Sequence, residues 1–296
     1  IYTGEDTLSL HDALPIYNTI LLNQLNKDIT QLYTIKTPEE IEKMRIAGSI
    51  AAKILDILND YVKPGITTRE LDKITHDLVV NRFNSETDRT DLEGHDSNSL
   101  QCIYYSHNEI IVRGEINDIP LKKGDIFGID LSLKKDGYCA DTQKMWVVGG
   151  DTSPLAMRLL AVAYGAMWTG IKLIKPGVHL GTISYNVQKY IESHGFKSVA
   201  QQGLTAHSIG KIHCEGLLLP FYGEQPNTGH VLQKGMVITI EPFVSAGNGL
   251  ADIIPNSVYT AVTKDKTLAA MWEHVVAVTD DGYDVLDLRH GEQGLI

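Results

Sequence analysis

The chain has 296 residues, of which 43% are hydrophobic and 21% are charged, and its formal net charge is −11. This composition is ordinary for a soluble globular protein, and the acidic balance argues against a nucleic-acid surface, which needs clustered Lys and Arg. No apolar run approaches the roughly 18 to 20 residues of a membrane span, and the three widely spaced cysteines favour a reducing compartment. We therefore expect a cytoplasmic protein that binds neither nucleic acid nor membrane.

The first clear structural signal lies at Thr37, and we expect residues 1–33 to be an N-terminal extension, partly artefactual and disordered. The segment His11–Ile16 resembles a translated sequencing adapter and is excluded from the fold argument. Residues 17–33 fit a short helix or a mobile arm. A single catalytic domain is expected over residues 34–290, followed by a short tail at 291–296.

The first predicted helix begins after Thr37, because Thr37–Glu40 has the form of a capping box with Pro at the first helical position. Apolar residues from Ile41 to Leu58 recur at helical spacing, and the Pro64-Gly65 pair is a strong stop signal. Two further helices are predicted over Arg69–Asn81 and Thr182–Ser193.

Two sequence patterns recur in the second half of the chain at nearly the same offset. Val62–Ile66 is echoed by Ile174–Val178, and Lys123–Asp130 is echoed by Lys234–Glu241. Two echoes at one offset are hard to reach by chance, and a repeat array would need more copies of shorter period. We interpret the chain as two related α+β halves, each of which supplies one carboxylate at the end of an equivalent strand.

A β-hairpin is predicted over Ile126–Val148, because alternating apolar residues flank a polar turn at residues 134–137 that contains Asp-Gly. Folding about this turn is expected to place Asp130 roughly opposite Asp141. Two facing carboxylates repel one another unless a divalent cation lies between them. The alternative is that one of the two side chains points to solvent.

Two more carboxylates interrupt apolar strands, and a histidine accompanies them. Glu241 ends one apolar run and Glu273 begins another, where a charge is rarely buried without a partner. A salt bridge is the alternative, yet no nearby Arg or Lys matches either residue. His207 would complete a mixed nitrogen and oxygen site suited to Mn, Fe, Co or Zn. Five such ligands can hold two divalent ions about 3.5 to 4 Å apart.

Several motifs together resemble those of type I methionine aminopeptidase. They are Ile35–Arg45, Gly124–Asp130, Asp136–Met145, Ala206–Gly210, Thr239–Pro242 and Glu273-His274. The resemblance implies a pita-bread fold, in which two pseudo-symmetric α/β halves surround a curved antiparallel sheet. It also implies removal of N-terminal methionine from new proteins or peptides, by a monomer that holds two divalent metal ions (Co, Mn, Fe or Zn). The implied ligands are Asp130, Asp141, His207, Glu241 and Glu273.

The substrate side departs from the family pattern. Arg113 stands where the family has a His that assists catalysis, and Arg cannot shuttle a proton. The segment expected to line the methionine pocket is polar here, with Asp96 and Ser99 as candidate contacts. His213 still resembles the substrate-facing histidine of the family, although the loop after His207 is altered, and Tyr259 takes the place of a pocket Trp.

The leading hypothesis is metal-dependent hydrolysis of an N-terminal peptide bond, with Glu241 as local base and His213 stabilising the developing charge. A second hypothesis is an aminopeptidase of changed specificity, because a polar pocket would accept a thioether poorly. A third is a non-catalytic homologue that binds metal or peptide, in which Arg113 clamps a carboxylate. A prolidase-like enzyme is disfavoured, because those relatives carry an additional N-terminal domain.

Overall fold

The structure is a computed structural model and describes residues 32–88, 102–201, 203–255, 257 and 259–292. The chain divides into two units, residues 1–32 and 33–296, and the description below concerns the second. The expected nature of residues 1–31 and the substrate candidates Asp96 and Ser99 lie outside the described residues. Within the described residues, no helix is long and apolar enough to cross a bilayer.

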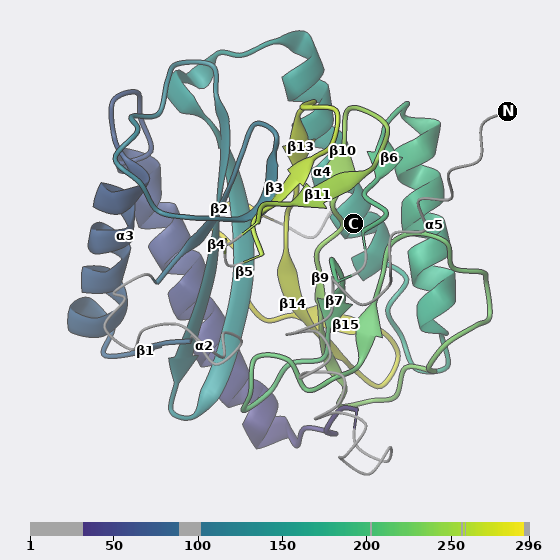
Figure 1. Cartoon of the computed structure of the whole chain (residues 1–296). Helices are drawn as coiled ribbons and strands as arrows, with labels where there is room; N and C mark the ends of the chain where they lie inside the picture. Colours follow the sequence, from purple (N-terminus) through teal and green to yellow (C-terminus); the bar gives the residue numbers. More distant parts are fainter. Residues whose placement is uncertain (1–31, 89–101, 202, 256, 258, 293–296) are drawn as a thin grey trace, which may run out of the picture. The chain divides into compact units, whose positions relative to one another are not determined.

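The described helices and strands come in runs: helices α2 and α3 precede strands β1–β5, and helices α4 and α5 precede strands β6–β15 (Figure 1). The α-helices are α2 Pro38–Ile57, α3 Thr68–Asp77, α4 Pro154–Ile171 and α5 Leu180–Ser193, with short helical turns at Leu58–Asp60, Leu78–Arg82 and Val148–Gly150. The strands of the first half are β1 Glu86–Thr87, β2 Tyr104–His107, β3 Ile110–Gly114, β4 Ile126–Lys135 and β5 Tyr138–Val147. Those of the second half are β6 Lys197–Ser198, β7 Ala206–His207, β8 Leu218–Leu219, β9 Val237–Ile240, β10 Val244–Ser245, β11 Ala251–Ile253, β12 Ala261–Thr263, β13 Ala269–Ala270, β14 His274–Val278 and β15 Tyr283–Val285.

The capping box predicted for the first helix is present. Thr37 Oγ1 accepts from the Glu40 N–H at 3.3 Å, and Glu40 Oε2 accepts from the Thr37 N–H at 3.0 Å. These two bonds satisfy backbone donors that the first helical turn otherwise leaves unpaired. The helix predicted from Arg69 begins one residue earlier, because Thr67 forms a second capping box with Glu70.

The duplication seen in the sequence is repeated in the backbone hydrogen bonds. Leu121 accepts one bond from the Gly65–Ile66 turn and donates one back, both at 2.8 Å. Leu232 makes the same pair of bonds with the Gly177–Val178 turn, at 2.9 and 2.8 Å. In each half a long helix precedes this turn and a shorter helix follows it. The two halves are therefore built on one local plan.

The described strands form four sheets, and every strand pair in them is antiparallel. The largest sheet has the order β1-β4-β2-β3-β12-β11, and β5 pairs along the full length of β4. A second sheet has the order β15-β14-β9. Helix α2 packs on β4 and β5, whereas α4 packs on α5 and on β9, β10 and β13, so each half has its own pair of helices (Figure 1). The fold is α+β, as predicted.

The predicted register of the β4–β5 hairpin is wrong by two residues. Asp130 pairs with Gln143, and Asp141 pairs with Ser132. The cause is a tight turn of only two residues, Asp136 and Gly137, whose φ values are 50° and 81°. Two positive φ values are typical of a type I′ turn. Because side chains alternate with a period of two, Asp130 and Asp141 still share one face as diagonal neighbours.

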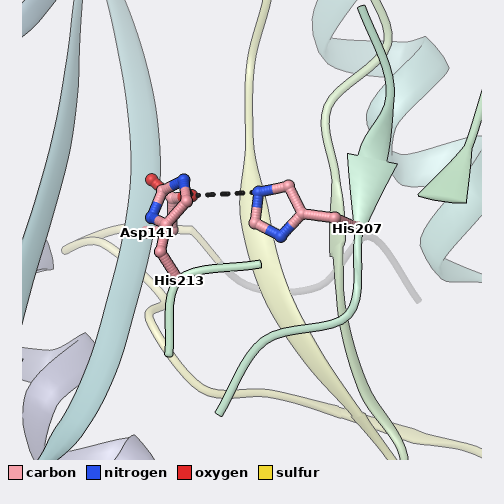
Figure 2. A group of neighbouring side chains, drawn as sticks. All are labelled: Asp141, His207 and His213. Atoms are coloured by element: carbon pink, nitrogen blue, oxygen red, sulfur yellow. Dashed lines mark ion pairs between the residues drawn. The ribbon is translucent and has the colours of Figure 1, made fainter. Parts of the chain in front are cut away.

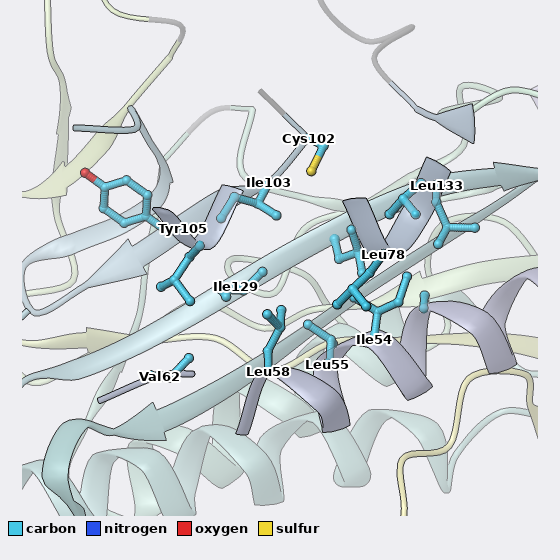
Figure 3. Close-up of a cluster of buried hydrophobic side chains, with 14 of the residues drawn as sticks. Ile54, Leu55, Leu58, Val62, Leu78, Cys102, Ile103, Tyr105, Ile129 and Leu133 are labelled. Atoms are coloured by element: carbon cyan, nitrogen blue, oxygen red, sulfur yellow. The ribbon is translucent and has the colours of Figure 1, made fainter. Parts of the chain in front are cut away.

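The interior of the first half is a continuous apolar cluster between α2, α3 and strands β2 and β4 (Figure 3). Ile54 and Leu55 of α2 and Leu58 of the helical turn that follows it are fully buried, and Ile129 and Leu131 of β4 belong to the same cluster. Burial of such side chains contributes about 1.5 to 3 kcal/mol each. This packing holds the hairpin rigid, and the hairpin carries Asp130 and Asp141.

Candidate metal centre

Five strands, β4, β5, β7, β9 and β14, bring the five predicted metal ligands to one region. Asp130 belongs to β4 and Asp141 to β5, and His207 is the last residue of β7. Glu241 directly follows β9 and Glu273 directly precedes β14. Because Ile240 of β9 pairs with His274 of β14, the two glutamates leave this sheet at the same end. Both halves of the chain therefore contribute to the centre.

Two groups of ligand atoms share Asp141. Asp130, Asp141 and Glu273 each offer an oxygen, and these atoms lie within 4.8 Å of one another. The second group combines Asp141 with His207 and His213 under the same limit. Figure 2 shows Asp141 on its strand facing His207, while His213 enters from the loop that follows β7. A carboxylate common to two ligand groups is the arrangement that a pair of bridged cations requires.

His207 connects the remaining glutamate to this cluster. Its Nε2 lies 3.5 Å from Asp141 Oδ2 and 3.8 Å from Glu241 Oε1. The other ring nitrogen, Nδ1, lies 3.3 Å from the carbonyl oxygen of Ser208. A proton on Nδ1 would satisfy that carbonyl and would leave the Nε2 lone pair free for a cation.

Two hydroxyl groups orient the carboxylates. Ser132 Oγ donates to Asp141 Oδ1 at 2.8 Å, across the observed hairpin register. Thr239 Oγ1 donates to Glu241 Oε1 at 2.8 Å and accepts from the His207 N–H at 3.0 Å. Such contacts fix a ligand's rotamer and leave its second oxygen available.

Several carboxyl groups of the cluster are buried close to one another, and both burial and their mutual repulsion change their pKa values. Burial and the charge of Asp141 raise the pKa of Asp130 and of Glu273 well above their ordinary values. Burial also raises the pKa of Glu241 to about 7, against the opposing effect of His207. Burial alone would raise the pKa of Asp141, but His213, His207 and Ser132 together lower it. Asp141 is thus the carboxylate best able to keep its charge.

The residues present fit a divalent metal. Asp130 Oδ1 is buried and has no hydrogen-bond partner among the described residues, and such an atom is costly unless it is satisfied. Neither Glu241 nor Glu273 has a Lys or Arg ion-pair partner in the described part of the chain. The donor set of oxygens with one or two imidazole nitrogens suits Mn, Fe, Co or Zn.

These pKa shifts predict that the metal-free protein loses stability as the pH rises. The folded chain holds the protons of Asp130, Glu241 and Glu273 more tightly than the unfolded chain, so this stabilisation is complete below about pH 4.5. For Glu241, whose pKa is raised to about 7, the stabilisation is on the order of 3 kcal/mol and is lost as the pH rises through 7. The pKa of Asp141 is lowered instead, so its contribution to stability is present at neutral pH and is lost as the pH falls.

Thermal melts in the presence of a chelator check this prediction. The melting temperature should be lower at pH 8 than at pH 5, and Glu241→Gln should reduce the difference. Added Mn²⁺ should stabilise the protein more at pH 8 than at pH 5, because cations bind the ionised ligands. A metal-free protein that is more stable at pH 8 would contradict the assignment.

A buried polar network behind the centre was not predicted from the sequence. Arg289 Nη1 donates to the carbonyl oxygens of Gln143 at 2.9 Å and Glu273 at 3.3 Å. His274 lies between Arg289 and Asp287, with 3.0 Å on each side. All three side chains are buried. The arginine therefore joins β5 to the backbone of Glu273, and the alternation of charge in Asp287-Leu288-Arg289 was the available signal.

Of the residues predicted to act on substrate, Arg113 and His213 lie close to the carboxylate cluster. Arg113 contributes a positive charge that opposes the rise in the pKa of Asp130 and of Glu241, and its guanidinium lies 5.7 Å from the ring centre of Tyr104. Arg113 and Tyr259 both have left-handed backbone, with φ of 56° and 64°. His213 was predicted to face substrate, and its Nε2 lies 3.5 Å from Asp141 Oδ2.

Comparison with known proteins identifies the family of the chain. Residues 42–280 match the model of metallopeptidase family M24. Methionine aminopeptidase of Salmonella typhimurium is 40% identical over 258 residues, which are 86% of this chain and 94% of that enzyme. The crystal structure of methionine aminopeptidase from Rickettsia prowazekii has a TM-score of 0.81 at 36% identity and covers 86% of this chain and 100% of its own. The prolidase of Pyrococcus horikoshii, at 20% identity and a TM-score of 0.67 over 88% of this chain and 65% of its own, is alike in fold alone.

Proposed function

The chain belongs to metallopeptidase family M24, among the methionine aminopeptidases and with their pita-bread fold, and we propose that it removes methionine from the N-termini of new proteins or peptides in the cytoplasm. The observation that carries the proposal is the convergence of five predicted ligands around Asp141. In this proposal Asp130, Asp141, His207, Glu241 and Glu273 hold two divalent ions, drawn from Co, Mn, Fe and Zn.

A bound pair of such ions supplies an acidic water and polarises the scissile carbonyl. The protein's own part in the reaction begins with Glu241, whose carboxylate takes up the proton that the attacking water releases. Thr239 holds this carboxylate through its Oε1, which leaves Oε2 for the reacting atoms. Protonation of the leaving amine by Glu241 completes the proton balance.

His213 supplies a second polar group to the reacting bond. Its Nε2 faces Asp141, and its Nδ1 is buried without a hydrogen-bond partner among the described residues. The side chain rests on a loop rather than on a strand, so it can turn toward a substrate carbonyl and donate to the oxyanion that forms there.

The second candidate function is an aminopeptidase of changed specificity, and Arg113 is the residue that favours it. Its guanidinium is a fixed cation at the edge of the centre, where it can bind a carboxylate but cannot transfer a proton. A substrate with an acidic side chain or a nearby carboxy terminus would gain from this charge. Short peptides would then be cleaved better than long ones.

A peptide assay separates these possibilities. Met-Ala-Ser should be cleaved after methionine when Mn²⁺, Fe²⁺ or Co²⁺ is added, and chelator should abolish the turnover. A panel that varies the first residue and the peptide length tests specificity, with Asp141→Asn as the inactive reference. Equal turnover by the enzyme and this reference across the whole panel would rule out aminopeptidase activity.

A further inference from the structure

A buried ion pair joins the segment before α2 to the loop that carries His213. Lys36 Nζ lies 2.6 Å from Glu215 Oε2, and the two side chains are only 2% and 6% exposed. Burial lowers the pKa of Lys36, while the charge of Glu215 acts against this effect. A buried pair of this kind is a poor source of net stability, since both charges are desolvated. The role of this ion pair is therefore to be found in the segments that it holds in place.

Glu215 is held on several sides. Both of its oxygens accept from Thr34, from the backbone N–H at 3.0 Å and from the hydroxyl at 2.6 Å. Its own N–H donates to the Ser208 carbonyl at 2.9 Å. Lys36 is also fixed by its backbone, because its N–H donates to the Gly235 carbonyl at 2.8 Å. The pair therefore connects two rigid backbones.

The loop is packed closely against this pair. At Gly210 an added Cβ would lie 2.4 Å from Glu215 Oε1 and 2.9 Å from Lys36 Cε. The Gly210 carbonyl accepts from Cys139 of β5 at 2.8 Å. His213 lies in the same loop, two residues before Glu215, with its Nε2 at 3.5 Å from Asp141 Oδ2. A shift of the ion pair must therefore move the imidazole.

We propose that Lys36 and Glu215 are positioning residues, whose buried ion pair holds the Ser208–Gly216 loop so that His213 stays at the metal centre. The kinetic part of this inference rests on the proposed aminopeptidase function. Misplacement of a catalytic group by about 1 Å can cost on the order of 10²-fold in rate. A loss confined to the transition state lowers kcat and leaves KM unchanged.

The kinetic test compares Lys36→Met, Lys36→Arg and the double variant Lys36→Met with Glu215→Met. Lys36→Met should lower kcat by on the order of 10- to 100-fold with little change in KM, and Lys36→Arg should restore much of the rate. The double variant should regain the melting temperature, because no lone buried charge remains, but not the kcat. Recovery of kcat together with melting temperature would reduce the pair to a structural role and overturn the proposal.

A second readout does not need turnover. The imidazole resonances of the metal-free, histidine-labelled protein, with His213 assigned through His213→Gln, should show His213 shifted in Lys36→Met. Lys211→Met is the matched control, because Lys211 pairs with Glu40 at 3.3 Å from the same loop but is exposed. If Lys36→Met does not fold, Glu215→Gln serves instead, since it keeps an acceptor for Thr34.

The two readouts distinguish two failures. An unmoved His213 resonance in Lys36→Met, or a shift no larger than in Lys211→Met, overturns the positioning role. Absence of turnover in the unaltered enzyme, with the resonance shifted as expected, rejects the aminopeptidase function and leaves the positioning role supported.

Discussion

Replacement of Asp141 by asparagine should lower kcat/KM by on the order of 10³-fold and abolish binding of at least one divalent ion. Asp141 is the residue common to both ligand groups, and its carboxylate is the one whose charge the neighbouring histidines favour. Asparagine keeps one oxygen and nearly the same volume, so the hairpin should fold. The loss would therefore report on charge rather than on packing.

Titration calorimetry with Mn²⁺ measures the number of ions bound, and the peptide assay measures turnover. Asp136→Asn is the matched control, because it makes the same chemical change at the exposed turn of the same hairpin. Asparagine also tolerates the left-handed backbone at that position. If Asp141→Asn bound the same number of Mn²⁺ ions and turned over peptide at the same rate, the proposed metal centre would be contradicted.

Replacement of Arg113 by histidine should raise kcat by on the order of 10²-fold or more, if proton transfer at this position is rate-limiting. Arginine stays protonated at every working pH, whereas histidine exchanges a proton near neutrality. Loss of the fixed charge should also strengthen binding of the second cation, since Arg113 acts on both Asp130 and Glu241. Histidine is among the side chains enriched in left-handed backbone, so the observed φ of 56° is no obstacle.

Arg113→Lys is the companion variant, because it keeps the positive charge while changing the shape of the head group. Steady-state kinetics on Met-Ala-Ser and on a panel of acidic peptides would be measured for both variants. A gain with histidine but not with lysine identifies proton transfer as the missing function. A loss in both variants, confined to acidic or short peptides, would instead identify Arg113 as a substrate clamp.

The sequence was informative where the signal is local. The Thr37–Glu40 capping box, the Asp-Gly turn and the duplicated Pro-Gly turns each depend on residues close together in the chain, and all were predicted. The proposed metal ligands were recognisable because a carboxylate at the end of an apolar strand, as at Glu241, is rarely buried unless a positive charge balances it. In each case the chemistry of a short segment limits its structure.

Features that depend on distant contacts were missed. The hairpin register differs from the predicted one by two residues, because a two-residue and a four-residue turn have nearly the same sequence signature. Nothing near Lys36 in the chain indicates that its partner is Glu215, and Arg289 gave no sign of reaching Gln143. Such pairings follow from tertiary packing, which brings together segments that the sequence separates.

The position of Arg289 has a consequence for how the enzyme matures. Synthesis proceeds from the amino terminus, so all five ligands leave the ribosome before the side chain that fastens Glu273 to β5. A nascent chain thus carries every proposed ligand before Arg289 can join the backbone of Glu273 to β5. Glu273 can therefore be joined to β5 by this side chain only after residue 289 has been synthesised.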